Sequence, residues 1–228
     1  MRKGFTIFIL LLSCFRIQAQ ENFKPETTIG IRQGINVSRV NFNPAISQNI
    51  TTGYLGGLVF KHISQESLGI QIELNFSQQG WNETMDSTFS YFRRLNSINL
   101  PLMTHIVLGT AKTNFFINLG PSLTYLISEK ENLKLDITKD EQIYYRKKID
   151  NRLEYGLCVG LGLVKPTSIG SFQIECRLNQ SLTDIFKQAS EPSILSSKMQ
   201  TVELSISYLI DFRKGTQFIY KRLSPNQS

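Results

Sequence analysis

The sequence lacks any apolar run long enough for a transmembrane helix beyond its N-terminal segment. No later stretch approaches roughly 18 consecutive apolar residues, whereas a helix that crosses a bilayer needs about 20. Histidine is also scarce, because only His62 and His105 are present, and neither has metal-ligand neighbours at a suitable spacing. We therefore expect no catalytic residues, no metal site, no cofactor and no enzymatic activity.

The sequence also has no excess of acidic residues, and its formal charge is +7. This positive charge comes from the two ends of the chain and not from its body. Residues 1–19 contain three basic residues and no acid, and residues 213–228 contain four basic residues and no acid. Basic and acidic residues therefore balance at 18 each between these ends. A neutral body gives no argument for nucleic-acid binding, and the basic tail is expected to be a solvated terminus.

The N-terminal segment has the pattern of a signal peptide. Arg2 and Lys3 precede the apolar run "FTIFILLLS", and Ala19 offers a signal-peptidase site. The alternative is lipoprotein processing at "LLSC", which would leave Cys14 as a lipid-anchored N-terminus. Both interpretations predict export from the cytoplasm.

Alternation of apolar and polar residues recurs through the rest of the chain, with the two-residue period of β-strands. Most of the alternating segments have about ten residues or more, the length that a tilted strand needs to cross a bilayer. We predict eight strands, at residues 28–37, 53–62, 68–81, 96–108, 114–127, 152–164, 171–182 and 200–212.

The connections between these segments alternate in length. Those after the second, fourth and sixth segments are short, and the remaining four are long, at residues 38–52, 79–93, 129–151 and 184–197. Short turns on one rim and long loops on the other are typical of outer-membrane barrels. An even strand number places both termini on the short-turn side.

The composition of the polar face distinguishes a soluble barrel from a membrane barrel. A soluble exterior should be rich in Lys and Glu, but here the polar face is mostly Gly, Ser, Asn, Gln and Thr. Small residues with sparse charges suit a narrow lumen, in which carboxylates and guanidinium groups pair because unpaired burial is costly. The lumen charges that we expect to form a structural network are Arg32, Glu73, Glu154, Glu175, Arg177 and Glu203. We expect Glu73 to pair with Arg32.

The same face assignment predicts whether the cysteines form a disulfide. Cys158 belongs to the lumen face and Cys176 to the lipid face, and side chains on opposite faces of neighbouring strands cannot be bridged without distortion. We therefore expect two free thiols in the mature protein.

The longest loop offers a candidate contact surface. Long loops of a barrel carry its variable function, and the loop at 129–151 contains a run of aromatic and basic residues: Tyr144, Tyr145, Arg146, Lys147 and Lys148. A merely solvated extension of the hairpin is the alternative.

Several blocks together resemble the PorT-like outer-membrane β-barrel family. "IQIELNFSQQG" is similar to the third-strand block of that family and "INLPLMTHIVLG" to the fourth. The later blocks "FFINLGPSLTYLI", "YGLCVGLGL", "FQIECRLNQSLTDIF" and "TVELSISYLI" follow in the family order. The sequence departs from the pattern at Asn99, where the family often has an acid, and in the tail after Phe212. The resemblance implies an outer-membrane barrel, and the founding member is linked to a secretion and gliding system.

The sequence thus predicts an all-β, eight-stranded antiparallel up-and-down transmembrane barrel. Residues 1–19 would be the signal peptide, residues 20–212 the barrel and residues 213–228 the tail. We expect a monomer in the outer-membrane lipid with a structural or interaction role, accessory to secretion or surface assembly through envelope or secretion-system proteins. A small porin-like channel or ligand-binding barrel is the alternative, and a lipid-modifying enzyme is less favoured.

Overall fold

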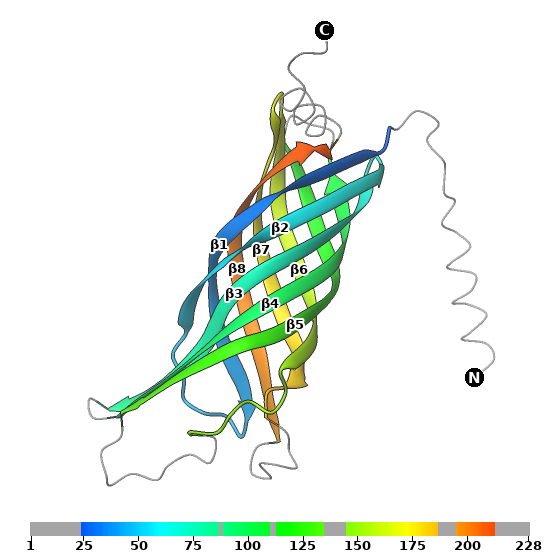
Figure 1. Ribbon diagram of the computed structural model, residues 1–228. Helices are drawn as coiled ribbons and strands as arrows, with labels where there is room; N and C mark the ends of the chain where they lie inside the picture. Colours follow the sequence, from blue (N-terminus) through cyan, green and yellow to red (C-terminus); the bar gives the residue numbers. More distant parts are fainter. Residues whose placement is uncertain (1–23, 87–88, 110–112, 135–144, 187–194, 213–228) are drawn as a thin grey trace, which may run out of the picture.

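The chain forms a closed barrel of eight antiparallel strands (Figure 1). The computed structural model describes residues 24–86, 89–109, 113–134, 145–186 and 195–212. The strands are β1 (Glu26–Asn43), β2 (Thr51–Gln65), β3 (Leu68–Asp86), β4 (Phe89–Leu108), β5 (Asn114–Lys134), β6 (Leu153–Thr167), β7 (Gly170–Asp184) and β8 (Ser196–Asp211). Each strand pairs with its sequence neighbours, and β1 closes the barrel against β8. The predicted fold is confirmed.

Within the described residues, no helix has both the length and the apolar character needed to cross a bilayer. The predicted signal peptide and basic tail, including Cys14, lie outside the described residues.

The two faces of β3 show how the barrel wall is polarised. Ile70, Leu74 and Phe76 are between 39% and 49% exposed, whereas the alternating Gln71 and Glu73 are buried inside. The other strands repeat this arrangement, so large aliphatic side chains cover the outer wall. An exposed apolar surface of this extent is the lipid-facing surface of a membrane barrel. Cys158 is buried and Cys176 exposed, and both are free thiols, which confirms the predicted parity.

The two rims differ as predicted. Strands β2 and β3 are joined through residues 66–67, and β6 and β7 through residues 168–169, at the end where β1 begins and β8 ends. This end is at the top of Figure 1. At the opposite end, β3, β4 and β5 continue beyond the remaining strands as a long sheet (Figure 1).

The predicted loop at 79–93 is wrong, because most of it is paired strand. β3 and β4 remain in register from Gln78↔Asn96 to Thr84↔Ser90. The loops at 38–52 and 129–151 are shorter for the same reason, since β1 extends to Asn43 and β5 to Lys134.

An inversion of polarity along these strands explains the error. Outward positions become polar at Asn82, Arg94 and Asn96, while the inward positions Trp81 and Leu95 are apolar and buried. Beyond the bilayer the outer wall faces water, so the apolar side chains belong inside. Alternate residues still point inward and outward along these strands. The inward residues are now apolar and the outward residues polar, which is the reverse of the pattern of a membrane strand.

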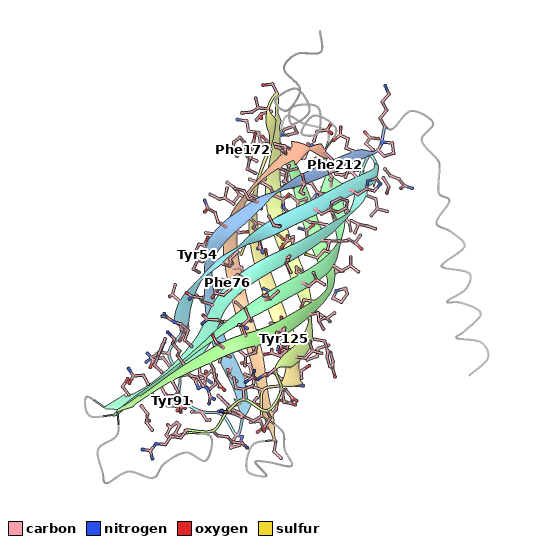
Figure 2. The ribbon with its side chains drawn as sticks, viewed as in Figure 1. Tyr54, Phe76, Tyr91, Tyr125, Phe172 and Phe212 are labelled. Carbon is pink, nitrogen blue, oxygen red and sulfur yellow. The ribbon has the colours of Figure 1, made fainter. Side chains whose placement is uncertain are left out.

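Aromatic side chains lie on the outer wall toward both ends of the barrel (Figure 2). Phe172 and Phe212 lie near the short-turn end, and Tyr54, Phe76 and Tyr125 lie further toward the other end. All five are exposed. Aromatic residues at these levels are typical of the interfacial girdles of membrane barrels.

The lipid-facing assignment predicts a depth-dependent cost for an added charge. Leu74→Arg places a cation in the apolar band and should lower the free energy of unfolding by about 2–4 kcal/mol. Asn96→Arg is the matched control, because it lies on the same face beyond the band and should cost less than about 1 kcal/mol. Reversible denaturant unfolding in lipid vesicles measures both values. Equal costs at the two positions would contradict the assignment.

Candidate functional site

Five of the six predicted lumen charges converge inside the barrel. Arg32 comes from β1, Glu73 from β3, Glu175 and Arg177 from β7, and Glu203 from β8. All five occupy inward positions of their strands and are buried. The site is therefore assembled from opposite parts of the barrel wall, which only closure of the sheet brings together.

The Glu73 carboxylate is the centre of this charge network. Arg177 binds it with two nitrogen atoms, each 2.7 Å from a carboxylate oxygen, and Arg32 Nη1 lies 3.1 Å from Oε2. The predicted pairing with Arg32 is thus present, and Arg177 is an additional partner. Gln71 and Asn75 on the same strand also donate to Glu73, at 2.6 and 2.8 Å. Bidentate contacts of this kind are among the strongest hydrogen bonds in proteins.

Two further carboxylates flank the centre. Glu175 accepts hydrogen bonds from Arg177 Nε at 3.0 Å and from Nη2 at 2.7 Å, and Glu203 lies 2.9 Å from Arg32 Nη2. Gly160 on β6 leaves the space that Glu175 uses, because a Cβ atom there would lie 2.0 Å from Glu175 Oε1. A side chain at position 160 would therefore displace the Glu175 carboxylate from its present position.

The network continues toward the short-turn end through residues that the sequence analysis did not assign to it. Lys61 Nζ donates to Gln173 at 3.1 Å. His105 Nδ1 lies 2.7 Å from Asn118 Oδ1, and Asn118 Nδ2 donates to Glu175 at 3.0 Å. The alternation in β2 places Lys61 on the inward face, and this pattern was the sequence signal that could have assigned Lys61 to the network.

Opposite charges balance in this part of the lumen. The cations Arg32, Lys61 and Arg177 accompany the anions Glu73, Glu175 and Glu203, and all six residues are less than 9% exposed. Such balance limits the cost of burying charge. The result is a set of cross-links that joins β1, β3, β7 and β8 through the barrel interior.

Glu154 is a correction to the predicted network. It is buried and faces inward, but no cation pairs with it among the residues that the structure describes. It lies near the long-loop end of β6 and lines a cavity of about 30 Å³ together with Ser77, Asn99 and Thr124. A polar cavity of this size has room for about two water molecules.

An aromatic cap closes the lumen on the long-loop side of this cavity. We define the cap as Trp81, Tyr91, Tyr145 and Phe186, all of which are buried. The Tyr91 and Tyr145 rings stack with centroids 4.4 Å apart, and Trp81 meets Phe186 edge to face at 6.5 Å. Trp81 Nε1 and the Tyr145 hydroxyl each donate to Glu83, at 2.9 Å. Burial raises the pKa of Tyr91 well above its usual range, so its phenol stays protonated.

Arg93 holds the cap together. Its guanidinium carbon lies 5.6 Å from the centroids of both the Trp81 and Phe186 rings. It also forms an ion pair with Glu129 and donates to the backbone carbonyl of Lys147. Cation–π and ionic contacts on one buried group link β4 and β5 to the loop after β5.

The predicted contact loop is only partly on the surface. Tyr145 is wrong as a contact residue, because its ring stacks on Tyr91 inside the cap and is 7% exposed. Arg146 and Lys148 are exposed. Lys147 forms an ion pair with Asp150, in which Nζ lies 3.6 Å from Oδ2. Tyr144 lies outside the described residues. The basic neighbours of Tyr145 indicate a surface position, but its ring is buried against Tyr91 in the cap.

The described interior consists of contacts between buried side chains. Among the described residues, no group of three or more His, Cys, Asp and Glu residues is placed to hold a metal ion. Arg32, Arg177, Glu73, Glu175 and Glu203 pair with one another, and the cap covers the polar cavity. The arrangement joins the strands and fills the lumen.

Comparisons with known proteins find one matching family model and several solved structures of similar fold. A family model described as an outer membrane protein beta-barrel domain matches residues 18–187. Similar solved structures include Neisserial surface protein A, at 12% identity and a TM-score of 0.46, covering 83% of this chain and 100% of that chain. Another is the Ail protein of Yersinia pestis, at 16% identity and a TM-score of 0.42, covering 81% and 99%. The protein OprG from Pseudomonas aeruginosa has 11% identity and a TM-score of 0.44, covering 84% and 96%. No curated protein matches the chain.

The network predicts unequal costs for removing its carboxylates. Glu73→Gln leaves two buried guanidinium groups without their shared anion and should lower the free energy of unfolding by about 3–5 kcal/mol. Glu203→Gln is the control, because Glu203 has one ion-pair partner and should cost about 1–3 kcal/mol. Denaturant unfolding in vesicles measures both. A Glu73→Gln barrel that is as stable as Glu203→Gln would refute the central role of Glu73.

Proposed function

The chain belongs to the outer membrane protein beta-barrel domain family, and on that premise we propose that it is a non-conducting barrel with a structural or interaction role. It is an outer-membrane barrel of the small eight-stranded type. The proposal assigns the membrane-spanning part to anchoring and the sheet beyond the rim to partners.

The filled lumen is the observation that carries this proposal. Arg32, Glu73 and Arg177 span the interior, and the aromatic cap lies between them and the long-loop mouth. An eight-stranded barrel has an interior just wide enough for side chains. Moving a solute through would require breaking buried ion pairs and displacing Trp81 and Tyr145. This supports an interaction protein over a channel.

The extension of β3, β4 and β5 supports an interaction role. These strands continue past the rim as a sheet and present polar residues outward, including Asn82, Asn96 and Asn132. A sheet that buries an apolar inner face is a rigid support for recognition. The resemblance to the PorT-like family favours a partner in protein secretion or surface assembly. The proposed role requires no catalytic chemistry.

A conductance measurement tests the closed lumen. The purified full-length protein in a planar bilayer should give no stable ohmic current, because ion pairs and the cap fill its interior. A matched experiment with Glu73→Gln checks whether the network is the barrier, since brief openings should then increase. A stable pore in the unaltered protein would overturn the proposal in favour of the porin-like alternative.

Crosslinking in cells tests the interaction role. A photoreactive residue at Asn132, exposed on the extension, should give adducts with other envelope proteins. The control position is Ser64, which is exposed at the short-turn end. Adducts should form at position 132 and be absent at position 64. Absence at position 132, or adducts confined to position 64, would contradict a partner at the extension.

A further inference from the structure

Two cations lie directly opposite each other on the outer wall beyond the apolar band. Arg94 on β4 pairs in register with Lys130 on β5. Side chains opposite one another on one face lie about 5 Å apart at Cβ, and like charges in such a pair are destabilising. The pair therefore needs a compensating anion.

The described part of the protein does not supply that anion. Neither side chain forms an ion pair with a described residue, and Arg94 instead stacks over the Phe92 ring at 5.2 Å. The nearest acids of β5 are engaged elsewhere, because Glu129 binds Arg93 and Glu131 accepts a hydrogen bond from the Arg146 amide. The two cations remain available to an external ligand.

The residues between this pair and the membrane define its height. Ile98 and Ile127, at 39% and 45% exposure, end the apolar band on β4 and β5. Asn96 and Ser128 follow on both strands and are joined by a hydrogen bond of 3.0 Å. The cations come next, so apolar, neutral polar and cationic levels succeed one another along the wall.

The strand geometry places the pair among lipid headgroups. Lys130 is three residues beyond Ile127, at which the pairing of β4 with β5 shifts register, and Arg94 is four residues beyond Ile98. These separations are about 10–13 Å along a strand at roughly 3.3 Å per residue, or roughly 7–9 Å of height at a tilt of about 45°. The headgroup layer is about 5–7 Å thick on each side, so the backbone lies at its outer edge and the long side chains of the two cations extend into it.

In outer-membrane barrels the long-loop rim is extracellular, and we propose that Arg94 and Lys130 bind a phosphate group of a phosphorylated lipid headgroup in the outer leaflet. A guanidinium group can hold two phosphate oxygens at once, and an ammonium group adds a point charge. Phe92 orients the guanidinium by stacking beneath it. A dianionic phosphate between the cations removes their repulsion, and the adjacent apolar band accommodates the acyl chains.

The binding of lipid A in nanodiscs tests the site. The full-length protein is placed in phosphatidylcholine nanodiscs that contain bisphosphorylated lipid A, and retained lipid is counted by native mass spectrometry. Retention should fall roughly tenfold in the double variant Arg94→Gln and Lys130→Gln, because each cation near an anionic surface contributes to binding. Arg39→Gln is the matched control, since Arg39 is also exposed near the long-loop end but bonds Gln200. That variant should retain lipid normally.

Three outcomes would overturn the proposal. Equal retention of lipid A without its phosphates would show that the headgroup phosphate is not recognised. An equal loss in Arg39→Gln would show a general effect of surface charge. Tighter, variant-sensitive binding of inorganic phosphate to the detergent-solubilised protein would assign the pair to a free anion. Heat-modifiable migration on gels verifies that each variant is folded.

Discussion

The buried carboxylate of Glu73 is the constraint on which the interior depends. An isolated carboxylate in a low-dielectric interior is very costly, so cationic partners must reach it from other strands. Arg177 and Arg32 do so from β7 and β1, which are adjacent to β8 rather than to β3. Satisfying one charge therefore requires a closed barrel in a defined register. The same contacts occupy the space through which a solute would pass.

The surroundings of the wall explain why the interior has two parts. Where lipid covers the outside, apolar residues must point outward, and the lumen is left with polar groups that bind one another. Beyond the bilayer, water covers the outside, and apolar groups such as Trp81 and Leu95 turn inward. The aromatic cap is the consequence, and it separates the polar cavity from the long-loop mouth.

The division of the wall also separates support from recognition. The membrane-spanning part is fixed by lipid contact outside and charge pairing inside. The extension of β3, β4 and β5 has a packed inner face and a polar outer face. Its outer face carries both the proposed contact surface and the Arg94–Lys130 pair, so lipid and protein partners would meet the same sheet at different heights.

The sequence by itself determined the all-β class, the strand number, the short-turn rim and the inward face, because alternation at period two reports which residues face lipid. It also anticipated the contact between Arg32 and Glu73, since both face a narrow lumen. The tertiary structure alone decided that Arg177 binds Glu73, that Glu154 lies outside the network and that Tyr145 is buried. These facts depend on distances across the closed barrel and on a polarity that inverts at the membrane surface. Local alternation carries no record of either.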